Sequence, residues 1–241
     1  MVITFYNQHY LPANTILLSI ISLLTALTPS ASVYAQNNQQ NSSIIRIQIP
    51  ISNNRYYIVR YRDTKPDDVP QEIYDRLFEI QMEVVNNFTY DYAVLNRRKK
   101  HQYMYTKEDF YKYGMGVCEN YSNFFIILAR EKGLTENLYK VSGNGRGGGH
   151  AWLEYRTENN VYIIDPTWSD DFAYTGGNAK ELFRESPAYG KHAFFITYPE
   201  SRIIFGSSRS HNSYTTRKTE TALWNTDEIT EMNEQISNED L

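Results

Sequence analysis

Three residues of types that cooperate in nucleophilic chemistry stand far apart in this chain: Cys118, His150 and Asp165. Cys118 is the single cysteine, so it cannot form a disulfide within the molecule. It follows Gly114 and Gly116, which interrupt helical periodicity, and it begins a stretch with helical spacing. A thiol in the first helical turn faces unpaired N–H groups and the positive end of the helix dipole, which favour the thiolate. We therefore expect a reactive cysteine; the alternatives are an intermolecular link and a buried cysteine that only packs.

His150 and Asp165 belong to two apolar stretches, HAWLEY and VYIIDPTW, separated by the turn-forming string RTENN. Alternate residues of a strand share a face, so His150 and Trp152 point the same way. If the strands form an antiparallel hairpin with an even-numbered loop, Asp165 falls near Trp152 on the face of His150. An imidazole supported by a carboxylate can take a proton from a thiol, which makes the three residues a candidate triad. Taken singly, His150 also suits a hydrogen-bonded core position, and Asp165 before Pro166 suits a turn.

A glycine-rich string, GNGRGGG, precedes His150 and contains the Gly-x-Gly-x-x-Gly spacing of nucleotide-binding loops. Such a loop must follow a strand and open a helix, so that helical N–H groups reach the phosphates. Here the glycines lead into a predicted strand. We therefore predict a flexible loop beside His150 that opens for substrate, and no phosphate site.

The elements that must position these residues can be predicted from hydrophobic spacing and from turn and cap signals. A helix opened by Pro70 carries an apolar stripe, Thr106 and Asp109 resemble a capping box, and Gly133 ends the helix that starts at Cys118. The predicted elements are strands at 44–49 and 56–61, helices from 70, at 107–113 and at 118–132, and strands at 150–155 and 161–165.

Composition argues against two classes of partner. The net charge is -4 and the isoelectric point is about 5.8, so a basic footprint for nucleic acid is missing. The run Arg97-Arg98-Lys99-Lys100-His101 is short and suits a solvated loop or helix end better than a contact patch. One cysteine and five scattered histidines lack zinc-ligand spacing, and an EF-hand pattern is not found. We expect no metal and no cofactor.

The chain is expected to have one folded domain. The apolar string TILLSIISLLTAL, followed by TPSASVYAQ, predicts a signal peptide over 1–35 with cleavage after Ala35, and hence a secreted or cell-envelope protein. The absence of Lys and Arg ahead of it leaves an uncleaved anchor as the alternative. Residues 36–43 read as a disordered leader, 44–205 as the domain, and 206–241 as a polar tail with an acidic terminal helix.

The combination GVCENYSNFFIILAREKGL, HAWLEY and VYIIDPTW resembles the transglutaminase-like superfamily, and within it bacterial proteins similar to kyphoscoliosis-type peptidases. The resemblance covers about Tyr105 to Trp168 and depends on Gly-Val-Cys, His-Ala-Trp and Asp-Pro-Thr-Trp in that order. It implies an α+β, papain-like fold with the nucleophile helix packed on an antiparallel sheet. It also implies that Cys118 is the nucleophile, His150 the general base and then acid, and Asp165 the orienting carboxylate.

These expectations lead to an exported cysteine enzyme that acts on amide bonds of a protein or peptide through an acyl thioester. The triad does not distinguish a peptidase, a deamidase and an amine-transferring crosslinker. The rival interpretation is a non-catalytic, transglutaminase-like binding module at the cell envelope. Trp152, Trp168 and Tyr121 are candidate substrate contacts, with core packing as the alternative for the tryptophans. The side chain that completes the oxyanion site is left open, with Gln102 and several tyrosines available.

Overall fold

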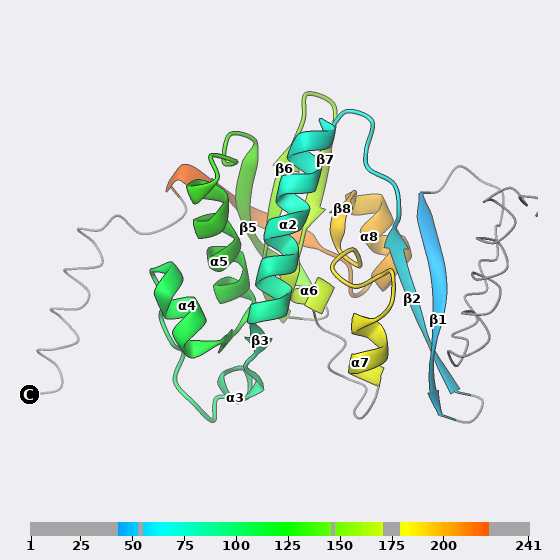
Figure 1. The fold of residues 1–241 in the computed structure, drawn as a ribbon, viewed down its shortest axis with the longest axis horizontal. Helices are drawn as coiled ribbons and strands as arrows, with labels where there is room; N and C mark the ends of the chain where they lie inside the picture. Colours follow the sequence, from blue (N-terminus) through cyan, green and yellow to red (C-terminus); the bar gives the residue numbers. More distant parts are fainter. Residues whose placement is uncertain (1–42, 53–54, 146–147, 171–178, 222–241) are drawn as a thin grey trace, which may run out of the picture. The chain divides into compact units, whose positions relative to one another are not determined.

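The computed structural model describes residues 43–52, 55–145, 148–170 and 179–221 (Figure 1). The predicted signal peptide, all but the last residue of the leader, and the predicted acidic helix lie outside these residues. Among the residues that are described, no helix is long and apolar enough to span a membrane.

In the described part of the chain, the strands form three sheets. A five-stranded antiparallel sheet has the order β8-β7-β6-β5-β9, β1 pairs with β2 antiparallel, and the two-residue strands β3 and β4 are parallel. The strands are β1 (Ile44–Ser52), β2 (Arg55–Arg62), β3 (Thr89–Tyr90), β4 (Met115–Gly116), β5 (Leu138–Gly145), β6 (Gly148–Arg156), β7 (Val161–Ile164), β8 (Phe194–Ile196) and β9 (Asn212–Lys218).

Helices cover the large sheet, so the predicted α+β class is confirmed. In Figure 1, α2 and α5 lie side by side across one face of the strands β5 to β7. The helices are α2 (Gln71–Asn87), α3 (Tyr92–Leu95), α4 (Lys107–Tyr113), α5 (Cys118–Glu131), α6 (Pro166–Asp170), α7 (Ala179–Arg184), α8 (Tyr198–Phe205) and the 3-10 helix η1 (Thr219–Thr221).

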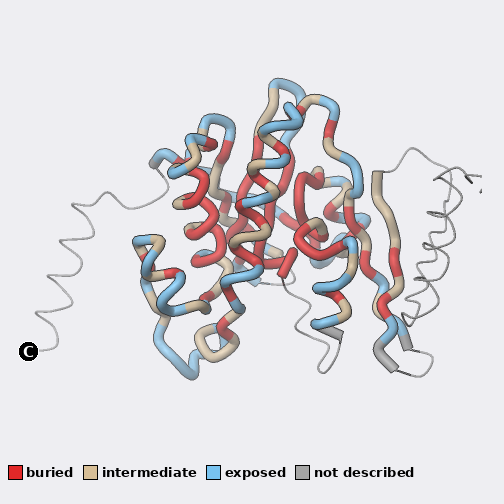
Figure 2. Tube along the Cα trace, viewed as in Figure 1, coloured by how far each residue is buried: buried red, intermediate tan, exposed pale blue. Residues whose placement is uncertain are grey.

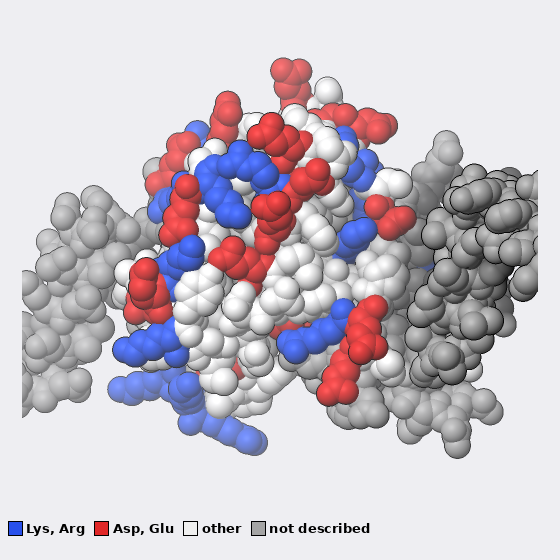
Figure 3. Space-filling view, in the orientation of Figure 1, with Lys and Arg blue, Asp and Glu red and all other residues white. Residues whose placement is uncertain are grey.

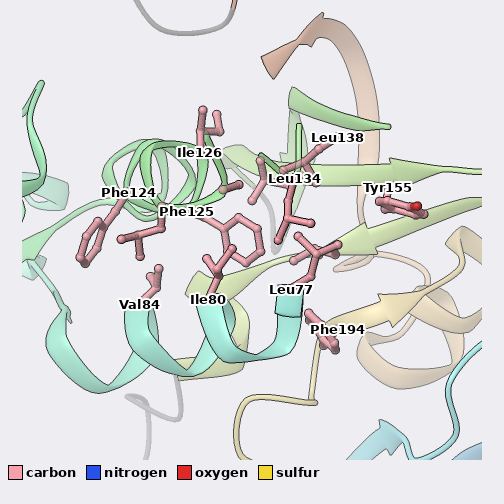
Figure 4. Packing of buried hydrophobic residues seen from close by; sticks show 14 of the residues in the cluster. Leu77, Ile80, Val84, Phe124, Phe125, Ile126, Leu134, Leu138, Tyr155 and Phe194 are labelled. Carbon is pink, nitrogen blue, oxygen red and sulfur yellow. The ribbon is translucent and has the colours of Figure 1, made fainter. Parts of the chain in front are cut away.

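The main core lies between α2, α5 and the sheet, and Figure 2 shows that the buried part of the chain runs through these elements. The predicted stripe of α2 points into it: Leu77, Ile80 and Val84 are fully buried, and Figure 4 shows them directed at side chains of α5. Burying one such side chain contributes about 1.5–3 kcal/mol, so this layer fixes the position of α5 on the sheet.

The opposite face of the large sheet carries a second apolar cluster, which includes Val141, Trp152, Ile163, Trp168 and Ile204. Trp152 belongs to this cluster, whereas its neighbour Leu153 belongs to the α2–α5 core. Successive residues of β6 therefore point to opposite faces, as the sequence predicts. Cluster and core together enclose the sheet between two apolar layers.

Local signals place most helix ends correctly. Thr106 and Asp109 form the predicted capping box at the start of α4. Gly133 follows α5 with a positive φ of 67°, and this left-handed conformation, which glycine adopts without strain, ends the helix. The β1–β2 hairpin is also as predicted, although both strands extend into the stretch between the predicted strands 44–49 and 56–61.

The predicted domain end at residue 205 is wrong. β9 pairs with β5 along Tyr139 to Asn144, so Asn212–Lys218 is an edge strand of the large sheet. All seven residues of β9 are exposed, which explains the tail-like sequence: the strand is held by backbone pairing rather than by an apolar face. The domain therefore extends beyond 205 and includes β9.

The basic run after α3 is solvated over 97–100, as its composition indicates, whereas His101 is half-buried. Residues 95–100 are exposed, and Lys99 pairs with Asp91 at 3.1 Å. In Figure 3 positive side chains gather at the α3 end of this face, while elsewhere positive and negative side chains are mixed.

Candidate active site

Cys118 is the first residue of α5, where the sequence places it, and is partly exposed. Val117 ahead of it has an extended backbone and supplies no side-chain cap. Gly116 is required by packing, because a Cβ at this position would come within 2.6 Å of the Asn120 side chain. The glycine thus lets the chain approach the helix closely and leaves the first turn available around the thiol.

Asn120 fastens the start of this helix and was not recognised in the sequence. Its Oδ1 accepts a hydrogen bond from the Val117 N–H at 3.0 Å and lies 3.0 Å from His101 Nε2. Its Nδ2 donates to the carbonyl oxygen of Gln102 at 3.1 Å. The segment around Gln102 is therefore tied beside the thiol helix, while the Gln102 side-chain amide donates to the Tyr103 carbonyl at 3.3 Å.

His150 and Asp165 are direct neighbours. Nε2 of His150 lies 2.6 Å from Oδ2 of Asp165, and both side chains are buried. The β6–β7 ladder pairs Leu153 with Ile164 and Arg156 with Val161. The hairpin loop between Arg156 and Val161 is thus even-numbered, and the next step of this register sets Asp165 beside Trp152, as predicted.

The carboxylate of Asp165 is held on both oxygens. Oδ1 accepts from the Trp168 N–H at 3.1 Å, which caps the first turn of α6, and the Asp165 N–H donates to the Ala193 carbonyl at 2.8 Å. Oδ2 lies 2.9 Å from Nε2 of His211 as well as 2.6 Å from His150. The acid is completely buried, so these hydrogen bonds replace its hydration.

Electrostatics favour the ionised pair. Burial alone would lower the pKa of His150, but the charge and hydrogen bond of Asp165, together with a hydrogen bond and charge interaction with Cys118, raise the pKa to about 9. Burial alone would raise the pKa of Asp165, but the two histidines outweigh it and lower the pKa below its usual range. Since Nε2 of His150 is engaged by Asp165, Nδ1 is the nitrogen left for Cys118.

The structure therefore brings together the three residues that the sequence selects, from α5, β6 and the start of α6. A family comparison agrees: residues 62–166 match the model described as the transglutaminase-like superfamily. This stretch contains Cys118, His150 and Asp165. Residues 62–166 belong to the transglutaminase-like superfamily. The fold class implied by the resemblance is thereby confirmed for the transglutaminase-like core.

Several solved structures, among them the following two, are similar to the chain. LapG of Legionella pneumophila is 16% identical, with 39% of this chain and 54% of that chain covered and a TM-score of 0.34. A protein described as a TGase is 15% identical, with 77% and 56% covered and a TM-score of 0.31. The chain thus spans about half the length of these structures (54% and 56%). A search of curated proteins finds no match.

The glycine-rich string was predicted to form a flexible loop beside His150, and the structure shows a different arrangement. Gly143 and Gly145 lie in β5 and Gly148 and Gly149 in β6, so the described glycines belong to paired strands and not to a flexible loop. A Cβ at Gly145 would meet the Trp168 ring at 2.6 Å and His150 Cδ2 at 3.3 Å. The prediction that these glycines do not form a phosphate-binding loop is consistent with their place in paired strands. Their lack of a side chain makes room for the rings that surround His150.

The three predicted substrate contacts are buried, which favours packing over substrate contact for them. Trp152 and Tyr121 are 0% exposed and Trp168 is 3% exposed. Tyr121 donates to Asp170 at 2.6 Å, and the Trp168 ring stacks on His150 at 4.8 Å between centroids. The three rings thus pack in the interior, which is the usual place of large aromatic side chains.

His211 contacts Asp165 of the candidate triad and was not recognised in the sequence, because it lies in the stretch read as a polar tail. Three groups, His150, Asp165 and His211, offer atoms within 4.8 Å of one another, which is compatible with metal ligation by residue type. The 2.6 Å between His150 Nε2 and Asp165 Oδ2 is, however, shorter than the roughly 3.3 Å between two ligand atoms of a tetrahedral zinc. The spacing fits a hydrogen-bonded network.

A polar pocket of about 550 Å³ adjoins this network. Its lining residues carry hydroxyl, amide and guanidinium groups as well as one histidine: Asn144, Gly145, Arg202, Ser207, Ser208, Ser210, His211 and Asn212. The pocket lies at the end of the sheet where β5 meets the start of β9, next to Gly145 and therefore close to His150.

Proposed function

We propose that this chain is a cysteine enzyme that acts on amide bonds of a protein or peptide. Membership of the superfamily supports the cysteine-enzyme class. The observation that carries the proposal is the buried His150–Asp165 pair, 2.6 Å apart, with Cys118 hydrogen-bonded to the same imidazole. Thiol, ring and carboxylate in one chain of contacts are what acyl transfer through sulfur needs.

The first half of the reaction forms an acyl thioester. The Cys118 thiolate attacks the carbonyl carbon of a glutamine side chain or a peptide bond, and the charge moves to the carbonyl oxygen. Cys118 is the first residue of α5, and the N–H groups of a first helical turn, which lack helical partners, can stabilise this oxyanion. The His150 imidazolium gives its proton to the leaving nitrogen, so ammonia or an amine departs and the C–N bond breaks.

The second half of the reaction breaks down the acyl thioester and regenerates the free enzyme. A water molecule or a primary amine attacks the thioester while neutral His150 accepts its proton, and the C–S bond breaks to release the Cys118 thiolate. Water gives a carboxylic acid, which is the outcome of a peptidase or deamidase. A lysine amine gives a new amide, which is the outcome of a crosslinker.

Alkylation of the single cysteine tests the proposal without knowledge of the substrate. We expect iodoacetamide to label the protein rapidly at pH 6, where a small-molecule thiol with a pKa of about 8.5 reacts slowly. Cys118→Ala removes the label and any activity. A non-catalytic binding module predicts instead that the protein reacts no faster than the small-molecule thiol at every pH, and that Cys118→Ala keeps all binding functions.

Incubation with a glutamine-containing protein and a fluorescent primary amine separates the two reaction classes. Incorporation of the amine identifies transfer, and ammonia release without incorporation identifies deamidation. New amino termini in the protein identify peptide cleavage. Cys118→Ala is the matched control, and each signal must disappear in it to be attributed to this thiol.

We also propose that the protein is exported, on the strength of its apolar segment at 15–27 and the small residues that precede Gln36. The mature chain is then expected to begin at Gln36. Intact mass measurement of the protein recovered from the producing cells checks this, and a chain that retains residues 1–35 in the cytoplasm contradicts it.

A further inference from the structure

A second histidine lies behind the triad. Nε2 of His211 is 2.9 Å from Oδ2 of Asp165, the same oxygen that His150 contacts. The His211 side chain is completely buried, and so is Asp165. His211 comes from the segment just before β9, whereas Asp165 precedes α6, so the fold joins two distant parts of the chain at one carboxylate oxygen.

Ser201 sets the orientation of the second ring. Its Oγ lies 2.8 Å from Nδ1 of His211 and accepts a hydrogen bond from the His211 N–H at 3.2 Å. The Ser201 hydroxyl proton is therefore available for Nδ1. A neutral His211 then accepts at Nδ1 and donates from Nε2 to Asp165, which satisfies every polar atom in this chain of contacts.

Aromatic rings hold His211 on its other sides. Its ring centroid is 4.0 Å from that of Trp168, 4.9 Å from Trp152 and 5.8 Å from Phe205. Among the described residues, Asp165 and His150 are titratable groups that face the ring, and Arg202 lines the pocket that His211 also lines. Because the Ser201 hydroxyl can donate to Nδ1 and Asp165 accepts from Nε2, the neutral form of His211 fits this site.

We propose that His211 is a positioning residue of the active site: by donating from Nε2 it holds the Asp165 carboxylate so that His150 keeps Nδ1 toward Cys118. The proposal rests on the proposed function, because it assigns a role within that reaction. His211 itself does not touch the thiol. Its effect passes through Asp165, whose Oδ1 is fixed by α6 and whose Oδ2 is fixed by the two imidazoles.

The pH dependence of Cys118 alkylation by iodoacetamide tests this in the full chain. We expect His211→Phe to lower the rate at pH 6 by roughly 10- to 100-fold, because a small misplacement of a catalytic group has effects of this size. At pH 10, where the thiolate forms without help from His150, the rate should equal that of the unmodified protein. His211→Gln keeps an N–H donor near the place of Nε2 and should restore most of the rate at pH 6.

His192→Phe is the matched control. His192 is also buried, packs on Phe205 and contacts the Arg60 carbonyl at 2.6 Å through Nδ1. We expect its replacement to lower thermal stability and leave the pH profile of alkylation unchanged. Equal profiles for His211→Phe and the unmodified protein would overturn the proposal, and so would a loss at pH 6 that His211→Gln does not restore.

Asp165→Asn separates failure of this proposal from failure of the proposed function. If the unmodified protein and Asp165→Asn both react like a small-molecule thiol, the triad itself is refuted. If Asp165→Asn loses the enhanced rate at pH 6 while His211→Phe keeps it, the triad stands and the role of His211 is refuted.

Nitrogen NMR of the histidine rings gives a second test that does not depend on a stable His211→Phe variant. At pH 7 the His211 signals, assigned by their loss in His211→Gln, should be those of a neutral ring protonated at Nε2. A ring protonated at Nδ1 only cannot donate to Asp165 and overturns the proposal. Ser201→Ala removes the partner of Nδ1 and should increase the share of that second tautomer.

Discussion

One carboxylate oxygen, Oδ2 of Asp165, organises the proposed chemistry at the residue scale. It contacts two imidazoles, and it is also the main source of the positive shift in the pKa of His150 that overcomes burial. A His150 that stays protonated at neutral pH is ready to protonate a leaving amine. The same charge would be unstable in this buried place without the carboxylate.

The activity is therefore expected to fall as pH rises through about 9, the raised pKa of His150, because the imidazolium that protonates the leaving group is lost there. Asp165→Asn removes the charge that raises this pKa, so the alkaline limb should move to lower pH. Rate measurements with a glutamine-containing protein over pH 5–10 check this. An alkaline limb that stays in place in Asp165→Asn would contradict it.

His150 and Asp165 also make the free energy of unfolding depend on pH, and each loses its contribution in a different direction of pH. His150 has a raised folded-state pKa, so its contribution is fully present below the usual histidine pKa of about 6.5 and is lost as pH rises through about 9. Asp165 has a lowered pKa, so its contribution is present above about 3.8 and is lost in acid. Together they favour the fold most between these limits.

Cys118, His150 and Asp165 were predictable because each stands in a short motif on an element with clear periodicity. His211 was not, since a lone histidine in the string SSRSHNSY carries no pattern that separates it from a surface residue. Asn120 was missed for a similar reason. Its partners, His101 and the Gln102 carbonyl, are brought to it by tertiary folding.

At the scale of elements, the glycines of the β5–β6 hairpin decide how closely the rings can pack. Gly145→Ala should destabilise the protein by about 1–3 kcal/mol and reduce activity, because a Cβ there lies 2.6 Å from the Trp168 ring, which rests on His150. Thermal unfolding and the Cys118 alkylation rate measure the two effects.

Gly149→Ala is the control for this change, because a Cβ at Gly149 meets nothing within 4 Å and the position is exposed in the same hairpin. We expect it to alter stability by no more than about 0.5 kcal/mol. Equal effects of the two substitutions would mean that close packing at Gly145 is not what the hairpin requires.

The helices were predicted well because their signals are local. Thr106, Gly133 and the stripe on α2 act within a few residues of the ends and faces that they define. The strand segments that contain glycine were not predicted because glycine is depleted in strands, and β9 was not because all its residues are exposed and show no apolar alternation. β9 takes its conformation from backbone pairing to β5, and a partner so far along the chain leaves no trace in the segment itself.

At the scale of the whole molecule, the segment after α8 is part of the domain. A chain that ends at residue 205 should lose its cooperative unfolding transition, because β5 loses its neighbour and Asp165 loses His211. It also loses η1, where Thr219 donates to the Leu138 carbonyl at 2.8 Å and Arg130 donates to the Thr219 carbonyl.

A chain that ends at residue 221 is the control and should unfold at nearly the temperature of the full chain, since every described element is retained. Calorimetry of both proteins, without the first 35 residues in either, measures the difference. Full stability of the shorter chain would show that the domain does end near 205 and that β9 is dispensable.

The order of the strands in the large sheet has a consequence for biosynthesis. A ribosome delivers α5, β6 and Asp165 well before β9, which takes the outer position beside β5. A nascent chain can thus begin to bury its apolar surface while His211 is still in the ribosomal exit tunnel. If His211 has the role proposed, the thiol gains its full reactivity only after the segment that leads into β9 has been synthesised and has folded against Asp165.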